Sequence, residues 1–224
     1  MKKISALFIV ILTVLLSACG TTTDRGNANN AVSSEASTER SSTGAKSLLV
    51  YFSIPETTKA DTVSGASQAS EDDLTTGNIQ SIAEKIESIT QSDILRLEVK
   101  EPYPEDYEET VARARKEINQ ETLPELETKL PDLAPYDTIY LGYPVWVTTV
   151  PPPIKTFLDE TDLTNKTVAL FATHAGYGLG DSQERIEEMI PNNTFVDTLA
   201  IEDEEVKNAD EVVQNWLSEN ELIK

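Results

Sequence analysis

A short run at residues 75–78, Thr-Thr-Gly-Asn, has the composition of a phosphate-binding turn. Gly77 has no Cβ, so the backbone there can approach an anion closely. Asn78 and Ile79 would present their N–H groups at the start of a helix, where a partial positive charge favours phosphate. Further hydroxyl donors are Ser53, Thr75 and Thr76. The run therefore predicts a phosphate site that needs no Lys or Arg, and the alternative interpretation is a plain turn before a helix.

Apolar patterning predicts five strands that alternate with five helices. Residues 48–52, 138–142 and 167–172 are apolar runs typical of buried parallel strands, whereas residues 94–99 alternate and suit a sheet edge. Residues 195–201 form a weaker last strand. The apolar positions at helical spacing are Ile79, Ile82, Ala83, Ile86 and Ile89; Tyr107, Val111, Ala114 and Ile118; Ile154, Phe157 and Leu158; Ile186, Met189 and Ile190; and Ala209, Val212, Val213, Trp216 and Leu217.

This alternation predicts an α/β fold, a doubly wound five-stranded parallel sheet with helices on both faces. The polar second strand fits the order 2-1-3-4-5, in which that strand lies at an edge. In such sheets ligands bind at the carboxyl ends of the strands, at the switch point beside the first strand. The loops that follow Phe52, Leu141 and Ala172 are therefore the expected site.

Those three loops resemble the loops of the flavodoxin-like family. The motifs are Tyr-Phe-Ser at 51–53, Thr-Gly-Asn at 76–78 and Gly-Leu-Gly at 178–180. The stretch 142–158 also matches, with Gly-Tyr-Pro-Val-Trp followed by Pro151, Pro153, Phe157 and Leu158. The resemblance covers residues 47–219 and implies a flavodoxin-like fold with FMN as the cofactor.

The resemblance implies that residues of all three loops bind FMN. Trp146 would lie against one face of the flavin, the alternative being a core or rim tryptophan, and Tyr177 would cover the other face. His174, the sole histidine, is expected to contact the flavin pyrimidine rather than act as a general base. The predicted contacts are Ser53, Thr58, Thr75, Thr76, Gly77, Asn78, Ile79, Pro144, Val145, Trp146, Thr173, His174, Ala175, Gly176, Tyr177 and Gly180.

The glycines of the 176–180 loop would let backbone N–H donors face the carbonyl edge of the flavin, although the same composition suits a surface loop without a ligand. A single histidine excludes a histidine-based metal cluster, and we assign neither a metal ligand nor a catalytic residue. Trp216, on the apolar face of the last helix, is predicted to be a core residue.

The chain departs from the family pattern at two places. Twenty-two residues, 54–75, separate Ser53 from Thr76 where the short form of the family has only a few. The insertion either forms a lid that brings Thr57, Thr58 or Ser67 to the phosphate or loops out into solvent. Ile79 stands where the family usually has Thr, so one hydroxyl donor is missing and we expect weaker FMN retention than in a typical flavodoxin.

The amino terminus has the pattern of a secretion signal and a lipid anchor. Lys2 and Lys3 precede an apolar run at 4–16, which is short for a membrane span. Leu-Ser-Ala-Cys at 16–19 resembles the lipobox of bacterial lipoproteins, which implies cleavage after residue 18 and acylation of Cys19 with chains such as palmitate. The alternative is an ordinary secretion signal with an incidental cysteine. We expect a signal peptide at 1–18, a lipidated Cys19 with a polar tether to residue 46, and a flavodoxin-like domain at 47–224.

The charge of the chain excludes some functions. With 18 Lys and Arg against 39 Asp and Glu, the formal charge is −21, which argues against nucleic-acid binding. Acidic runs such as 202–205 are solvated faces or, alternatively, a docking surface for a basic redox partner. A phosphate-accepting receiver needs acidic residues after the first strand, where this chain has Phe52 and Ser53.

The sequence therefore predicts an FMN-binding lipoprotein that transfers electrons at the extracytoplasmic face of the cell membrane to an unidentified redox partner. The alternatives are an NAD(P)H-dependent flavin oxidoreductase that acts on quinones or similar acceptors, and a non-redox lipoprotein that binds another phosphate ester.

Overall fold

The computed structural model describes residues 46–54, 68–71 and 74–223, all within one compact unit, Ser42–Lys224. The predicted signal peptide, Cys19 and the tether up to residue 45 lie outside the described residues. So do Thr57, Thr58 and Ser67 of the insertion.

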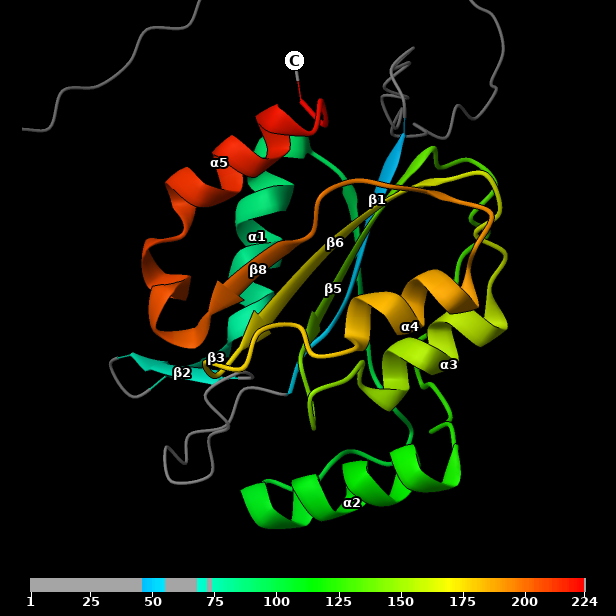
Figure 1. Ribbon diagram of the computed structural model, residues 1–224, viewed down its shortest axis with the longest axis vertical. Coiled ribbons are helices and arrows are strands. Elements are labelled where there is room, and N and C mark those ends of the chain that lie inside the picture. Colours follow the sequence, from blue (N-terminus) through cyan, green and yellow to red (C-terminus); the bar gives the residue numbers. More distant parts are fainter. Residues whose placement is uncertain (1–45, 55–67, 72–73, 224) are drawn as a thin grey trace, which may run out of the picture. The chain divides into compact units, whose positions relative to one another are not determined.

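The centre of the domain is a parallel sheet in the order that the sequence predicts (Figure 1). Strand β1 (Ser47–Phe52) pairs with the edge strand β4 (Asp93–Leu97) on one side and with β5 (Thr138–Pro144) on the other. Strand β5 pairs in turn with β6 (Thr167–His174). Strands β7 (Thr194–Phe195) and β8 (Leu199–Glu202) both pair with β6. With β7 and β8 taken as the fifth strand, this is the 2-1-3-4-5 order of the flavodoxin-like fold.

One face of the sheet is covered by the first and last helices. Helix α1 (Asn78–Thr90) and helix α5 (Asp210–Glu219), preceded by the short helix η2 (Asp203–Asn208), bury a core with Tyr140 and Phe171 of the sheet. Trp216 lies in this core, as predicted, and its Nε1–H donates to the carbonyl of Asp197 at 2.6 Å. The first residues of α1 lie next to the end of β1, where Gly77 contacts Ser53.

The other face carries α3 (Pro152–Glu160) and α4 (Ser182–Met189), which pack on a core that includes Leu141, Phe157 and Ile186. Helix α2 (Tyr107–Gln120) is different, because in Figure 1 it lies beyond the carboxyl ends of the strands instead of flat against the sheet. Only Thr110 and Ala114 of α2 are buried. The helix thus leaves much of its apolar side near the predicted ligand end.

The last strand differs from its prediction. The single strand expected at 195–201 is two short strands, interrupted at 196–198. Val196 N–H still donates to the carbonyl of Val168 in β6 at 3.2 Å. At Asp197 the backbone bonds to the end of α5: its N–H donates to Asn220 Oδ1 at 2.9 Å, and its carbonyl accepts from Trp216. Hydrogen bonds to a distant helix thus replace the sheet ladder at Asp197.

The insertion also contains structure that the sequence did not predict. Residues Gln68–Glu71 (β2) and Leu74–Gly77 (β3) form an antiparallel hairpin next to α1. Thr75 and Thr76, expected in a turn, therefore lie in a strand that runs directly into α1, in keeping with the strand preference of β-branched residues.

Four residues placed on buried helix faces are in fact exposed: Ile89, Tyr107, Met189 and Val212. Ile89 and Met189 lie in the last turns of α1 and α4, where the helices extend past the sheet. The edge strand also begins and ends earlier than expected, at 93–97 instead of 94–99.

Two buried tyrosines make the stability of the fold sensitive to alkaline pH. Burial raises the pKa of Tyr140 and of Tyr143 from 10.0 to about 12 in each case. Because the folded-state pKa is raised, the stabilisation is complete below pH 10 and is lost as the pH rises from 10 toward about 12. Each tyrosine should cost about 1.4 kcal/mol of unfolding free energy per pH unit in that window. Denaturant unfolding at a series of pH values measures this loss.

The matched control is Tyr140→Phe, which keeps the ring and removes the titrating hydroxyl. Its unfolding free energy should fall less steeply above pH 10 than that of the parent protein. Identical slopes for the two proteins would show that Tyr140 titrates normally in the folded state.

Candidate functional site

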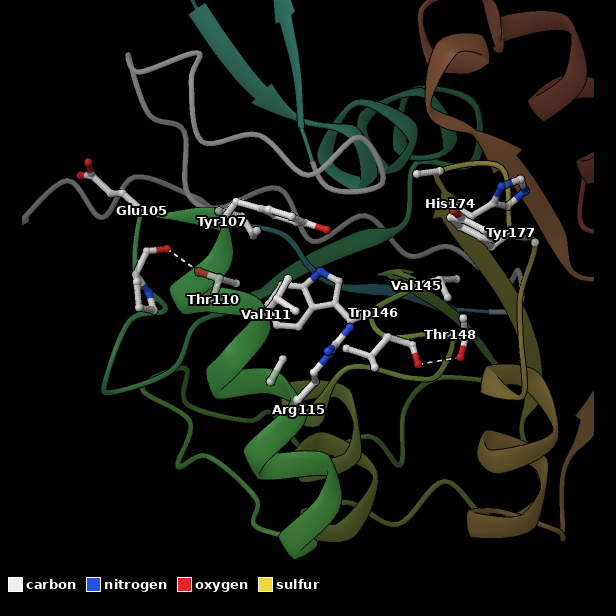
Figure 2. Close-up of a pocket in the computed structure, with 16 residues that line it drawn as sticks. Glu105, Tyr107, Thr110, Val111, Arg115, Val145, Trp146, Thr148, His174 and Tyr177 are labelled. Atoms are coloured by element: carbon white, nitrogen blue, oxygen red, sulfur yellow. Dashed lines mark hydrogen bonds between the residues drawn. The ribbon is translucent and has the colours of Figure 1, made fainter.

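A cavity of about 240 Å³ lies at the carboxyl ends of the central strands (Figure 2). Its walls come from Ile54 after β1, from the 145–148 loop after β5, from the 174–178 segment at the end of β6, and from α2. These are the loops at which the topology predicts a ligand. Five predicted contacts line this cavity: Val145, Trp146, His174, Ala175 and Tyr177.

Trp146 is held in an aromatic cluster. Its ring meets Phe52 edge-on at 5.2 Å between ring centroids and Tyr103 at 4.9 Å, with interplanar angles of 84° and 82°. Only 6% of Trp146 is exposed, so most of its side chain is buried in the core, as the alternative interpretation expects. The part that remains lines the cavity, where the predicted flavin contact stays a prediction.

Tyr103 in turn fixes α2 to this cluster. Its hydroxyl donates to Glu117 Oε2 at 2.6 Å, and the Arg113 guanidinium lies over its ring at 4.1 Å while donating to Glu117 Oε1 at 2.8 Å. Burial and the bond to Glu117 raise the pKa of Tyr103, so the hydroxyl stays a donor at neutral pH. The cluster therefore holds α2 at the cavity.

The loop after β5 has a backbone conformation that its residue types disfavour. Val147 and Thr148 both lie in the left-handed region, with φ of 50° and 60°. Trp146 and Thr149 close this two-residue turn with reciprocal N–H···O bonds of 3.1 and 2.9 Å. Positive φ at β-branched residues costs on the order of 1–3 kcal/mol each, and such strain gathers at binding sites.

Neighbouring groups hold this strained turn in place. The N–H of Asp181 donates to the carbonyl of Thr148 at 3.0 Å. Hydrogen bonds, first from Thr149 and then from Arg185, lower the pKa of the Asp181 carboxyl. Gly180 has a φ of 59°, and a Cβ there would lie 1.9 Å from the Thr148 oxygen. The glycine is thus required for the close contact between the two loops.

The predicted phosphate residues Ser53 and Gly77 lie next to each other, while the approach of an anion to Gly77 stays a prediction. A Cβ on Gly77 would lie 1.8 Å from the hydroxyl oxygen of Ser53, so the glycine makes room for Ser53. The contact joins the end of β1 to the start of α1 despite the insertion between them. Gly77 is also the N-cap of α1, and no side chain caps the helix there. Its first backbone N–H groups are therefore suited to an anion.

The remaining predicted residues are either buried next to these loops or exposed in the loop after β6. Asn78, Ile79, Pro144 and Thr173 are buried, and the carbonyl of Thr173 accepts from Val145 N–H at 2.8 Å. Gly176 and Gly180 lie in the exposed loop that carries Tyr177, which is 82% exposed at the rim. His174 is half-buried, and its Nδ1 has no hydrogen-bond partner among the described residues. Thr58 lies outside the described residues.

Sequence reasoning missed the wall that α2 contributes. Its cavity-lining residues are Tyr107, Thr110, Val111, Ala114 and Arg115, joined by Pro104 and Glu105 just before the helix. The apolar spacing of Tyr107, Val111 and Ala114 was visible, and it was interpreted as a face packed on the sheet. The signal that could have identified the wall is Arg115, a cation next to that apolar stripe.

The described part of the chain contains no group of three or more His, Cys, Asp or Glu residues placed to hold a metal ion. Within the same residues, no helix has the length and apolar character needed to cross a bilayer.

The strained turn gives a stability prediction. Val147→Asn replaces a β-branched residue at positive φ with one that tolerates this conformation, so the free energy of unfolding should rise by about 1 kcal/mol. Thermal or denaturant unfolding of the two proteins measures the change. Val212→Asn is the matched control, because Val212 is also exposed but lies inside α5. The control should be neutral or destabilised, and a destabilised Val147→Asn protein would contradict the assignment of strain.

Comparison with known proteins agrees with this geometry. The sequence profile of a family described as Flavodoxin matches residues 72–220. A candidate flavoprotein from Bacteroides eggerthii is 23% identical, with a TM-score of 0.62 over 81% of this chain and 100% of its own. A flavoprotein from Lactobacillus acidophilus, solved in complex with FMN, is 26% identical, with a TM-score of 0.53 over 74% of this chain and 98% of its own. No curated protein matches the chain. Because the family profile spans well over half of the sequence, and the sheet has the family's strand order, the chain belongs to the flavodoxin family.

Proposed function

We propose that this protein binds FMN and transfers electrons as a lipoprotein held at the extracytoplasmic face of the cell membrane. The observation that carries the proposal is the meeting of three loops, those after β1, β5 and β6, around one cavity at the switch point of the sheet. The FMN complex of the Lactobacillus acidophilus relative supports the choice of cofactor.

The phosphate of FMN would bind at the start of α1. Ser53 and the uncapped first turn of the helix provide a hydroxyl and backbone N–H donors there. Backbone donors suit a chain of formal charge −21, because they attract an anion locally through the helix dipole. Affinity for the phosphate then depends on geometry more than on cations.

The flavin ring would lie in the cavity, against the 145–148 loop and the 174–178 segment. Trp146 and Val145 offer apolar surface, and the loop with Tyr177 covers the rim. When bound, FMN supplies the one- and two-electron chemistry. The protein binds the ring, orients it and limits its contact with water.

The lipid anchor is supported by the sequence at residues 16–19, Leu-Ser-Ala-Cys. A lipid on Cys19, followed by the polar tether, would keep the domain close to a membrane without placing it in the bilayer. A partner protein that exchanges electrons with the flavin would then have to be reachable from the membrane surface.

Removing one phosphate donor tests the cofactor assignment. Ser53→Ala should weaken FMN binding about tenfold, because a hydrogen bond to a charged group is lost. Riboflavin lacks the phosphate, so its affinity should stay the same. Quenching of flavin fluorescence, titrated with full-length apoprotein, measures both dissociation constants.

Ser92→Ala is the control, because Ser92 is an equally buried serine next to the amino end of the sheet, where it bonds to Ser47. It should leave both affinities unchanged. An equal loss of FMN and riboflavin in Ser53→Ala would show that the phosphate binds elsewhere, and a parent protein that takes up no FMN would refute the function.

Membrane attachment depends on one residue. Cys19→Ser should abolish incorporation of labelled palmitate in the expressing bacterium and leave the precursor uncleaved. Metabolic labelling and membrane fractionation measure both effects. Labelling that persists in the variant would reject the lipoprotein assignment.

A further inference from the structure

The loop at 176–180, between β6 and α4, lies at the cavity but is held by few hydrogen bonds. Figure 2 shows Tyr177 of this loop at one side of the cavity. Among the described residues, two hydrogen bonds fix the backbone of the loop, and the carbonyl of Leu179 accepts both of them. Gly178 and Gly180, on either side of Leu179, have positive φ of 65° and 59°, so the backbone there is easily rearranged. The position of the loop therefore depends strongly on the groups that hold Leu179.

Ser182, the first residue of α4, donates both of these hydrogen bonds. Its N–H lies 3.1 Å from the oxygen of Leu179, and its side-chain hydroxyl lies 2.6 Å from the same oxygen. Ser182 is fully buried, so its hydroxyl group must find its partners inside the protein. The beginning of α4 thus holds the end of the cavity loop.

Tyr143 of β5 bonds to this serine from the core. Its hydroxyl oxygen lies 3.1 Å from Ser182 Oγ, and its side chain is fully buried. A serine hydroxyl has one proton, and that of Ser182 goes to Leu179, so Tyr143 is the donor in its bond to Ser182. Burial raises the pKa of Tyr143 to about 12, which keeps its proton in place at neutral pH. We call this chain of two hydrogen bonds, from Tyr143 through Ser182 to Leu179, the Tyr143 relay.

The Tyr143 relay connects the two loops that carry most of the predicted flavin contacts. Tyr143 stands two residues before Val145, which lines the cavity and bonds to the carbonyl of Thr173 at 2.8 Å. That bond joins the start of the loop after β5 to the end of β6. The relay then reaches the other end of the loop that β6 begins. A single buried side chain is therefore placed to fix both loops relative to each other.

We propose, on the basis of the function given above, that Tyr143 is a positioning residue for the flavin ring, which acts by holding the 176–180 loop at the cavity through Ser182 and Leu179. Tyr143 is fully buried and is not among the residues that line the cavity, so it does not touch the ring itself. A loop held in place before the ligand arrives loses less entropy on binding, which raises affinity.

The proposal predicts which part of the cofactor is affected. The 176–180 loop lies at the cavity where the ring would bind, whereas the phosphate would bind at the start of α1, on the other face of the sheet. Loss of the Tyr143 relay should therefore weaken binding of the ring and leave the phosphate contacts as they are. This is the opposite of the effect expected for Ser53→Ala.

Proteolysis of the full-length apoprotein tests the first step without any ligand. Tyr177 is 82% exposed, and chymotrypsin can cleave after it once the loop leaves its held conformation. Tyr143→Phe keeps the ring and removes the donor of the relay. This variant should be cleaved after Tyr177 about five times faster than the parent protein, as expected from the loss of one hydrogen bond. Mass spectrometry of the fragment that ends at Tyr177 measures the rate at this site alone.

Flavin titration of the same proteins tests the second step. Tyr143→Phe should raise the dissociation constants of FMN and riboflavin by the same factor, about fivefold, because the two ligands share the ring. Quenching of flavin fluorescence measures both constants.

Tyr140→Phe is the matched control, because Tyr140 is a buried tyrosine of the same strand whose side chain packs on the other face of the sheet. It should change neither the cleavage rate nor the two dissociation constants. Ser182→Ala removes the middle of the relay and should have at least the effect of Tyr143→Phe. Combining the two substitutions should add nothing to Ser182→Ala, because residues of one hydrogen-bonded chain act together.

The outcomes separate this proposal from the proposed function. A Tyr143→Phe protein that is less stable, but equals the parent in cleavage after Tyr177 and in both affinities, would overturn the proposal, since the hydroxyl would then serve the fold alone. Weaker binding of FMN with unchanged riboflavin, or full additivity of the two substitutions, would also overturn it and leave the flavin assignment standing. A parent protein that takes up no flavin refutes the proposed function and the role of Tyr143 in flavin binding, and the cleavage rates then still decide whether Tyr143 holds the loop.

Discussion

The candidate site depends on the way the hydrogen bonding between β5 and β6 continues beyond the strands. The two strands pair from Thr138 and Thr167 to Pro144 and Thr173. The N–H of Val145 then bonds to Thr173, and the N–H of Asp181 bonds to Thr148. Both cavity loops are therefore tied to the sheet and to each other by backbone bonds, which vary little with side-chain sequence. Loops fixed in this way can pre-form a binding surface, so less ordering entropy is lost when a ligand binds.

The aromatic cluster adds the third wall to this frame. Trp146 touches Phe52 of β1 and Tyr103 of the segment before α2, and Tyr103 is bound to Glu117 on α2. One contact network thus connects the first strand, the loop after β5 and a helix that otherwise buries only Thr110 and Ala114. The position of α2 is set by this network rather than by packing on the sheet, which explains why its apolar residues are available at the cavity.

The order of the sheet could be predicted because buried parallel strands are continuous apolar runs. Three such runs are present, too short for a typical helix, at residues 48–52, 138–142 and 167–172. The details that failed depend on distant partners. The break at 196–198 comes from hydrogen bonds of Asp197 to α5, and the strand at Thr75 and Thr76 comes from pairing with residues 68–71.

The site was predicted in outline for the same reason: the topology brings the loops together whatever their side chains are. The left-handed turn at Val147 and Thr148 could not be predicted, because β-branched residues ordinarily avoid that conformation. Nor could the part of the cavity lined by α2, since the apolar spacing is the same for a helix packed on a sheet and for one that faces a ligand. The contact of Gly77 with Ser53 could not be predicted either, because the insertion at 54–75 separates the two residues in the sequence.

Charge is distributed so that binding at the site does not rely on the overall field. Several basic side chains of the domain form ion pairs with acidic ones, for example Lys85 with Asp210 and Arg113 with Glu117. The chain as a whole repels anions, yet the uncapped start of α1 offers a local positive potential through backbone N–H groups, and such a field acts within a few ångström. An anion at this helix is therefore bound by short-range geometry, and the same excess of acid opposes any further negative charge on a ring bound nearby.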